Sequence, residues 1–279
     1  MHKSSEIVVR QGAALVKRQS PTEAAAAQKH FVFDLDETLG SFGEMYEIWK
    51  QNQQQSSSEA SSIDFLVKLL TIFPEFLRSG IVSILQFLYQ KKKAGLFGHL
   101  YIYTNNQCGR KWTENLVHAI EQVAHTPYLF DHIICAFKIN NVVIESRRTS
   151  HWKTWSDFVR CTLLPTTAHI CFIDDTYFPY MKRDRVFYLQ PRPYEHSLSM
   201  DEIHKRLNEN HLEMPESLLL RVFASPTPYD SSASDRLLFY LNEFFNMSLR
   251  RPSTRKVKGR FWYNLSQKKR QKSSTNGRP

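Results

Sequence analysis

Residues 30–38 read His-Phe-Val-Phe-Asp-Leu-Asp-Glu-Thr, and residues 30–34 form a short apolar run that ends abruptly in acids. Such a run is typical of a parallel strand that is buried on both faces. In open parallel sheets, ligands bind at the carboxyl ends of the strands. The stretch therefore predicts a buried strand whose carboxyl end carries functional side chains, of which Asp34 is the first.

Four more apolar runs of similar length follow along the chain. They cover residues 100–103, 133–136, 170–173 and 186–189. Patterns typical of helices separate most of them, at residues 81–93, 111–124 and 150–163, with Ser150 as the expected cap of the last. This alternation predicts an α/β fold, a doubly wound, Rossmann-like parallel sheet of about five strands.

The segments around these runs suggest how the chain is organised. Residues 1–28 are polar and Ala-rich without a usable period, and we expect a flexible arm. We expect residues 29–195 to form the core domain, with a small helical cap insertion at residues 41–79. Within that insertion, the Gln- and Ser-rich residues 51–62 are expected to form a flexible loop before a helix at residues 63–73.

A C-terminal helical extension is predicted over residues 196–249. Its helices are expected at residues 200–212, 215–223 and 235–249. The last helix carries an apolar stripe formed by Leu237, Leu241, Phe244 and Phe245. We expect this stripe to pack onto the sheet, because that is the usual role of an apolar helix face.

The charge of the chain is concentrated in its last segment. There are 37 Lys or Arg against 27 Asp or Glu, for a formal net charge of +10. Residues 250–279 hold eleven of the basic residues and no acid, so the rest of the chain is nearly neutral. We expect this tail to be disordered. It is a nuclear localisation signal, a nucleic-acid contact that uses Phe261, Trp262 and Tyr263, or a solubilising tail.

The composition also bears on the cellular compartment. The four cysteines form no Cys-x-x-Cys pair, and no apolar segment of a secretory signal follows residues 1–5. The most apolar stretch, residues 65–89, is interrupted by Pro74 and by charged residues such as Arg78, so it falls short of a membrane span. We expect a soluble intracellular protein, nuclear or cytoplasmic, without membrane contact.

Several well-known catalytic motifs are missing. No cysteine has an arginine six positions later, which excludes a Cys-based phosphatase loop. The nine glycines form neither a dinucleotide-binding fingerprint nor a Walker A loop. The eleven histidines are scattered without the spacing of a zinc site.

Three of the predicted strands end in the residue types that phosphoryl transfer needs. Asp34 and Asp36 follow the first, Thr104-Asn105-Asn106 the second, and Asp174-Asp175 the fourth; Lys153 lies near the start of the preceding helix. A carboxylate can attack a phosphomonoester only if cations neutralise the developing charge, so acids and a lysine are needed together.

Each of these residues alone has an ordinary explanation. A strand-terminal Asp is commonly a cap or turn residue, and a lone lysine usually lies on a solvated helix face. Arg147, Arg148 and Arg160 are alternatives to Lys153 as the fixed positive charge. What favours a catalytic site is the combination, in which each residue stands at the functional end of its element.

The order of these motifs resembles that of haloacid-dehalogenase-like phosphatases. Asp34-Leu-Asp-Glu-Thr38 is similar to their first motif, and the apolar strand closed by Thr104 is similar to the second. Lys153, followed 21 positions later by Asp174-Asp175, resembles the third and fourth. The likeness covers about residues 30–195. The sequence Asp-Leu-Asp-Glu-Thr-Leu at residues 34–39 is most similar to that of the group that dephosphorylates the RNA polymerase C-terminal repeat, together with the NLI-interacting-factor-like relatives of that group.

The resemblance implies a role for each acid. Asp34 is the nucleophile that forms an aspartyl phosphate, and Asp36 is the general acid and base. A Mg²⁺ ion is held by Asp34, by the backbone carbonyl of Asp36 and by Asp174, while Asp175 holds its waters. Thr38 is expected to shape the turn that orients Asp36.

The remaining residues are expected to bind the phosphoryl group. Thr104 and the neighbouring backbone amide of Asn105 contact its oxygens, and Lys153 supplies the fixed positive charge. The resemblance thus predicts a Mg²⁺-dependent phosphatase.

By the same resemblance, the small cap implies a phosphorylated protein substrate, with phosphoserine or phosphothreonine, because family members with little cap accept phosphoproteins or other macromolecules. The polymerase-repeat group shows Asp-Asn-Ser-Pro where this chain has Asp-Asp-Thr-Tyr at residues 174–177, which leaves the substrate open. The alternatives are a polynucleotide or small-metabolite phosphatase with the same site, or a degenerate phosphoprotein- or nucleic-acid-binding scaffold.

Overall fold

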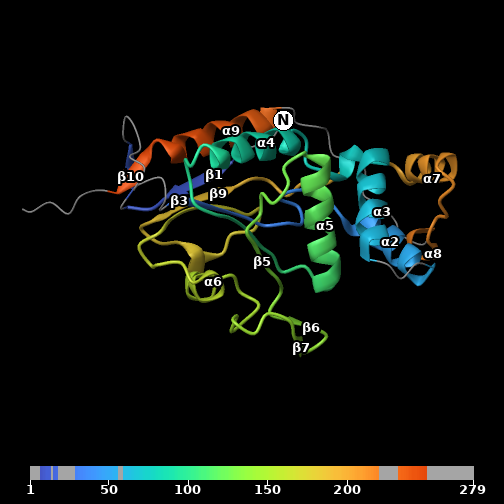
Figure 1. Cartoon of the computed structure of the whole chain (residues 1–279), viewed down its shortest axis with the longest axis horizontal. Helices are drawn as coiled ribbons and strands as arrows, with labels where there is room; N and C mark the ends of the chain where they lie inside the picture. Colours follow the sequence, from blue (N-terminus) through green and yellow to red (C-terminus); the bar gives the residue numbers. More distant parts are fainter. Residues whose placement is uncertain (1–6, 14, 18–28, 56–58, 220–231, 250–279) are drawn as a thin grey trace, which may run out of the picture.

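The computed structural model describes residues 7–13, 15–17, 29–55, 59–219 and 232–249. At its centre is a six-stranded sheet (Figure 1). In spatial order the strands are β1 (Val8–Gln11), β9 (Val186–Gln190), β8 (His169–Ile173), β3 (Lys29–Phe33), β4 (Leu100–Tyr103) and β5 (His132–Ile134). The last five run parallel, and β1 is antiparallel to β9. These five are the strands predicted from the sequence.

Helices cover both faces of this sheet, as the doubly wound prediction requires. α4 (Ile81–Lys93) and α9 (Ser232–Phe245) lie along one face, and α6 (Trp155–Thr162) lies on the other (Figure 1). The strand side chains alternate between two buried clusters: Phe31 and Phe33 belong to the first, and Val32 to the second. The α/β fold class is therefore confirmed.

The apolar stripe on α9 packs on the sheet as predicted. Leu237, Leu241, Phe244 and Phe245 are all buried. The ring of Phe244 lies 5.2 Å from that of Phe31 and 5.9 Å from that of Phe187, centroid to centroid. The stripe therefore closes the first apolar cluster over β3 and β9.

The predicted cap insertion contains more helix than expected. Its elements are α2 (Gly43–Gln55), α3 (Glu59–Ile72) and the short η1 (Pro74–Phe76). α3 packs on α5 (Arg110–Val123), and α7 (Met200–Glu209) and α8 (Glu216–Leu219) lie on the far side of α2 and α3 from α5 (Figure 1).

The prediction of a flexible loop at residues 51–62 is wrong for residues 51–55 and 59–62, which are helical. Tertiary packing overrides the composition here. The buried Ser62 hydroxyl accepts hydrogen bonds from Trp49 Nε1 at 2.8 Å and Asn115 Nδ2 at 2.9 Å. The serine therefore serves as a polar contact between α2, α3 and α5.

The prediction of a flexible arm over residues 1–28 is also wrong in part. Val8–Gln11 pairs with β9, and Arg10 donates to the side chain of Gln190 at 2.7 Å. β2 (Leu15–Lys17) pairs with β10 (Met247–Leu249), so the helix predicted to reach residue 249 ends at Phe245. Both pairings join distant parts of the chain, and local periodicity contains no signal of them.

The helix predicted from Ser150 begins later. Thr154 is its cap, with Oγ1 accepting from the amide of Asp157, and α6 starts at Trp155. Residues 150–153 therefore precede the helix. This places Lys153 on an irregular segment, from which its side chain enters the site.

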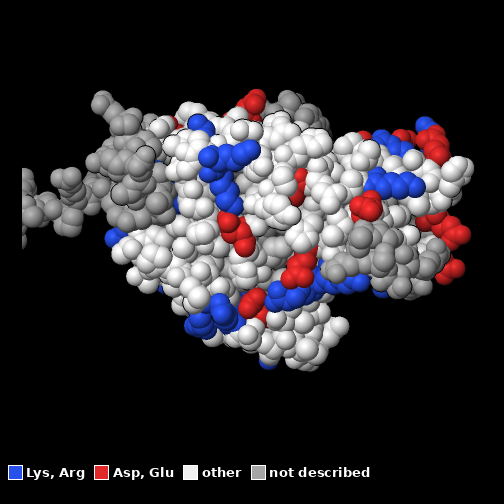
Figure 2. All heavy atoms as spheres, in the orientation of Figure 1, with Lys and Arg blue, Asp and Glu red and all other residues white. Residues whose placement is uncertain are grey.

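The remaining expectations lie partly outside the described residues. The helix predicted at residues 215–223 is observed only as Glu216–Leu219, and most of the rest of it is not described. The basic tail, residues 250–279, lies wholly outside them. Within the described chain, no helix has both the length and the apolar character needed to span a bilayer. On the face drawn in Figure 2, basic side chains mostly lie next to acidic ones.

Candidate active site

The site lies where the strand order of the sheet reverses. From β3 the chain moves outward to β4 and β5, and it then returns to the other side of β3 to form β8 and β9. Ligand crevices of open α/β sheets form at this point, outside the carboxyl ends of the strands. Asp34 follows β3, and Asp174 and Asp175 follow β8, so adjacent strands bring the three acids together.

These three carboxylates form a buried cluster. Asp34, Asp174 and Asp175 each have an oxygen within 4.8 Å of those of the other two, and their exposed fractions are 7%, 0% and 7%. Hard oxygen donors are the ligands that Mg²⁺ prefers. The donor set therefore fits a magnesium ion.

Lys153 is the cation that contacts this cluster. Its Nζ donates to Asp34 Oδ1 at 2.6 Å and to Asp174 Oδ2 at 2.7 Å, and the residue is only 1% exposed. The three alternative cations make other contacts. Arg147 donates to the Cys161 carbonyl, Arg160 pairs with Asp157, and Arg148 donates to backbone carbonyls.

Burial and charge act in opposite directions on these groups. Burial raises the pKa of Asp34 and of Asp174, and the Lys153 ammonium opposes that rise. Burial alone would lower the pKa of Lys153, but the carboxylates of Asp174 and Asp34 outweigh it, so that pKa is raised. Lys153 therefore stays charged and compensates part of the negative charge of the cluster.

Asp36 is held by a residue that the sequence interpretation left without a role. Asn106 Nδ2 donates to Asp36 Oδ2 at 2.9 Å, while Asn106 Oδ1 accepts from the amide of Cys108 at 2.8 Å. The backbone contact fixes the orientation of the side-chain amide, so its NH₂ group faces the carboxylate. Burial, and then the charge of Asp34, raise the pKa of Asp36 to about 6, and the bond from Asn106 opposes this.

The turn between Asp36 and α2 is tightly constrained. Glu37 has a φ of 57°, in the left-handed region, and Gly40 forms bridges with both Asp36 and Leu77. A Cβ atom at Gly40 would lie 2.3 Å from the Phe76 carbonyl oxygen, so only glycine fits there. The turn brings Thr38 to Asp175, and the two residues exchange hydrogen bonds of 3.0 Å.

Arg78 binds the backbone of the same turn. The residue is 7% exposed, and its guanidinium donates to the carbonyls of Glu37, Thr38 and Arg192 at 2.5 to 2.7 Å. The amide of Tyr194 donates to the Glu37 carbonyl as well, at 2.8 Å. Burial lowers the pKa of Arg78 to about 10, which leaves it charged at neutral pH. Arg78 and the segment of residues 192–194 thus both hold the turn at residues 37–38, which follows Asp36.

The loop after β4 contains the predicted phosphate-binding residues. Thr104 is 1% exposed, and its Oγ1 accepts from the amide of Asn106 at 3.0 Å. The side-chain oxygen of Asn105 accepts from Arg148 at 2.7 Å, and Arg148 also donates to the Thr104 and Cys135 carbonyls. The loop is therefore fixed by Arg148, while contact of Thr104 and Asn105 with a phosphoryl group stays a prediction.

Sequence reasoning missed Asn106, Arg78 and Arg148 as parts of the site. Asn106 stands in the polar run after a strand, a signal that could have found it. The sequence suggests Arg148 only as a substitute for Lys153, and Arg78 only as an interruption of an apolar stretch. Both bind backbone carbonyls, and such contacts leave no residue pattern in the sequence.

Comparison with known proteins adds little to this geometry. No family model and no curated protein matches the chain. A solved structure with partial similarity is a phosphoserine phosphohydrolase-like protein from Francisella tularensis subsp. tularensis SCHU S4. The identity is 16%, the TM-score is 0.31, and the match covers 55% of this chain and 80% of the other. A likeness of this size does not assign a function.

Proposed function

We propose that the chain is a Mg²⁺-dependent phosphatase that hydrolyses phosphomonoesters through a phosphorylated Asp34. One observation carries the proposal: Lys153 bridges Asp34 and Asp174 in a buried cluster that also includes Asp175. A buried arrangement of three acids around one lysine is costly to maintain without a function. The match between the motif order and haloacid-dehalogenase-like phosphatases supports the same chemistry.

The reaction is proposed to proceed in two steps. A carboxylate oxygen of Asp34 attacks phosphorus, the bond from phosphorus to the leaving oxygen breaks, and Asp36 donates its proton to that oxygen. Asp36 then takes a proton from a water molecule whose oxygen attacks the aspartyl phosphate. The bond between Asp34 and phosphorus breaks, which releases phosphate and restores both residues.

The surroundings of Asp36 suit this double role. A pKa near the working pH lets one carboxyl group act first as an acid and then as a base, and the pKa of Asp36 is raised to about 6. Asn106 fixes the position of the carboxylate. Together these features support Asp36, rather than Asp34, as the group that moves protons.

Positive charge is required throughout. A magnesium ion held by Asp34, Asp174 and Asp175 would supply Lewis-acid stabilisation of the phosphoryl oxygens. Lys153 keeps a fixed positive charge beside the nucleophile, and Thr104 would bind a phosphoryl oxygen. Asp175 is held by Thr38, so it keeps one orientation while charge moves between the other groups.

Hydrolysis of an aryl phosphate tests this proposal directly. We expect Mg²⁺-dependent turnover by the wild-type chain, loss of turnover on chelation, and a decrease of at least about 10³-fold in Asp34→Asn, which lacks the nucleophile. The exchange His118→Gln, at an exposed position on α5, is the control. Turnover that survives Asp34→Asn would refute the mechanism. Mg²⁺ binding without turnover would favour the degenerate scaffold.

A further inference from the structure

Two exposed aromatic residues stand beside the site. Trp152 is 53% exposed and Tyr180 is 57% exposed, and their rings are nearly perpendicular with centroids 6.1 Å apart. Large apolar rings at this exposure commonly mark contact surfaces. The pair does not belong to the catalytic cluster, and the proposed mechanism assigns it no role.

A chain of contacts connects this pair to the nucleophile. The ring of Trp152 packs against that of Phe178 at 6.1 Å, and the Phe178 ring lies 5.1 Å from Lys153 Nζ. Lys153 in turn binds Asp34. The exposed pair therefore lies two packing contacts from the lysine that binds the nucleophile.

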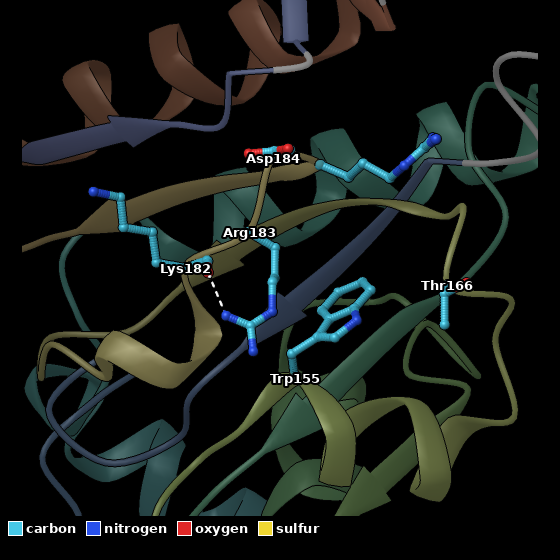
Figure 3. A pocket seen from close by; sticks show the side chains of 6 residues that line it. Trp155, Thr166, Lys182, Arg183 and Asp184 are labelled. Atoms are coloured by element: carbon cyan, nitrogen blue, oxygen red, sulfur yellow. Dashed lines mark hydrogen bonds between the residues drawn. The ribbon is translucent and has the colours of Figure 1, made fainter. Parts of the chain in front are cut away.

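A basic pocket lies further along the same two chain segments, toward the amino ends of β8 and β9. It has a volume of about 410 Å³ and is lined by Trp155, Thr166, Lys182, Arg183, Asp184 and Arg185. Trp155 lies two residues after Lys153, and Lys182 directly follows η2 (Pro179–Met181), which carries Tyr180. In Figure 3 the side chain of Arg183 extends toward Trp155, and that of Lys182 points away from it.

The charge of the pocket selects an anionic ligand. Its lining has three basic side chains and one acid, Asp184. Arg185 Nη1 donates to the Thr167 carbonyl and Arg183 Nη1 to the Lys182 carbonyl, both at 2.9 Å. Lys182 and Arg183 are nevertheless exposed. The volume lies within the range of small-ligand sites, about 300 to 1,000 Å³, and suits a unit the size of a nucleotide.

We define the aromatic–basic surface as Trp152, Tyr180, Trp155, Lys182 and Arg183. Aromatic side chains interleaved with basic ones are the features with which proteins bind single-stranded nucleic acid, because every base has a face that stacks and every linkage carries a charge. An acidic or phosphorylated peptide would satisfy the charges but would leave the rings without a regular partner. The surface therefore favours a polynucleotide.

Building on the proposed phosphatase activity, we propose that the phosphomonoester is the terminal phosphate of a single-stranded polynucleotide. The terminal phosphate lies at Asp34, the adjoining bases stack on Trp152 and Tyr180, and separate internal phosphates further along the strand bind Lys182 and Arg183. This assigns a substrate class to the site that differs from the phosphoprotein predicted from cap size.

Binding without turnover tests the surface independently of catalysis. The probe is a fluorescein-labelled oligothymidylate of about 12 nucleotides with a 3′-phosphate, a length within known single-strand site sizes. Affinity is measured by anisotropy in the Asp34→Asn background. Adding Lys182→Glu and Arg183→Glu should weaken binding at least about tenfold near 0.1 M salt. The slope of log affinity against log salt should fall by about 0.7 for each phosphate group that the variant no longer binds.

A charge-matched control separates this effect from general electrostatics. Lys93→Glu with Lys205→Glu makes the same change of charge on α4 and α7, and should leave the affinity within about twofold of the parent. Residues 250–279 are present in all variants, so any contribution from the tail cancels. Each variant must unfold at the same temperature as the parent before the affinities are compared.

The aromatic pair has its own ligand control. An oligomer with the same phosphodiester backbone but no bases keeps the charge and lacks the stacking faces. The Asp34→Asn parent should bind the thymidylate about tenfold more tightly than this abasic oligomer, a difference that stacking on one or two bases supplies. In Trp152→Ala with Tyr180→Ala, that preference should largely disappear.

Failure of this inference is distinguishable from failure of the proposed function. If the two glutamate exchanges on the surface weaken binding no more than the control pair, or if the parent does not discriminate against the abasic oligomer, the polynucleotide assignment is wrong. It is also overturned if the wild-type enzyme dephosphorylates a phosphoserine peptide and leaves the 3′-phosphate intact. Absence of aryl phosphate turnover would instead refute the phosphatase mechanism.

Discussion

Thr38 and Asp175 hydrogen-bond to each other twice. Thr38 Oγ1 donates to Asp175 Oδ1, and the Asp175 amide donates to Thr38 Oγ1, both at 3.0 Å. One hydroxyl thereby joins the turn after β3 to the turn after β8. Since Asp34 and Asp174 begin these turns, the relationship sets the spacing of the carboxylates from which the site is built.

Thr38→Val keeps the shape of the side chain and removes the hydroxyl. Partners that orient metal ligands typically contribute 10- to 100-fold in metal affinity, so we expect Mg²⁺ binding to weaken by about tenfold. Thr38→Ser keeps both hydrogen bonds and should retain most of the affinity. Calorimetric titration with Mg²⁺ alone measures this without any substrate. Equal affinities for Thr38→Val and wild type would show that Asp175 needs no partner.

Arg78→Met removes a buried cation that positions the turn without belonging to the acid cluster. The Thr38 and Arg192 carbonyls lose this donor, while the Glu37 carbonyl keeps the amide of Tyr194. An unsatisfied buried acceptor costs about 1 to 3 kcal/mol, so we expect the free energy of unfolding in urea to fall by about 2 kcal/mol. The kcat for an aryl phosphate should fall more than KM changes, because the turn holds Asp36.

Arg206 provides the matched control for this exchange. Its side chain is 25% exposed, pairs with Glu75 and Glu202, and donates to the Ile72 carbonyl at 3.1 Å, away from the turn that holds Asp36. Ion pairs open to solvent contribute up to about 1 kcal/mol, so Arg206→Met should destabilise the fold less than Arg78→Met and leave kcat unchanged. A similar kcat in Arg78→Met and Arg206→Met would remove Arg78 from any positioning role.

Lys153→Met leaves the buried acids without their cation. Removing one partner of a buried ion pair typically costs about 3 to 5 kcal/mol, and we expect a loss of that order in the free energy of unfolding without Mg²⁺. Adding Mg²⁺ should raise the unfolding temperature of the variant more than that of wild type, because the ion replaces the missing charge.

A double-mutant cycle makes this prediction specific to the cluster. Lys153→Met with Asp34→Asn removes one acid together with the lysine, so repulsion within the cluster is smaller. The double variant should therefore be more stable than Lys153→Met alone, by about 1 kcal/mol or more. Purely additive effects of the two exchanges would mean that the residues do not interact.

The sequence was informative about the sheet and the acids for one physical reason. Parallel strands place their carboxyl ends on one edge, so residues that follow different strands converge even when the chain between them is unknown. Asp34, Asp174 and Asp175 come together in this way, and Lys153 is in contact with two of them. The catalytic roles of these residues stay predictions.

What the sequence did not reveal depends on single long-range contacts. β1 reaches its partner β9 across most of the chain, and Ser62 becomes ordered because Trp49 and Asn115 bind its hydroxyl. Arg78 acts through backbone carbonyls, which every residue has. None of these contacts produces a periodic pattern or a characteristic spacing, so no inspection of neighbouring residues would find them.

Two buried histidines near the amino ends of β3 and β8, opposite the site, should make the stability of the fold depend on pH. His30 and His169 are 3% and 2% exposed. Burial lowers the pKa of each to about 4. For His30 the neighbouring imidazoles of His99 and His169 add to this and Asp131 opposes it, and for His169 the charges of Arg185 and Lys29 add to it. Because the folded-state pKa lies below the unfolded value of about 6.5, the unfolded chain takes up protons first as pH falls.

The stability contributed by these two histidines is therefore complete above about pH 6.5 and is lost as the pH falls toward 4. Between pH 7 and pH 5 we expect each to lower the free energy of unfolding by about 2 kcal/mol. His169→Leu should reduce the total loss by about that amount, whereas exposed His118→Gln should not. Urea unfolding at both pH values measures it. Comparison with wild type cancels the buried carboxyls, whose raised pKa values act in the opposite direction. An equal loss in His169→Leu and wild type would mean that His169 is already protonated in the fold.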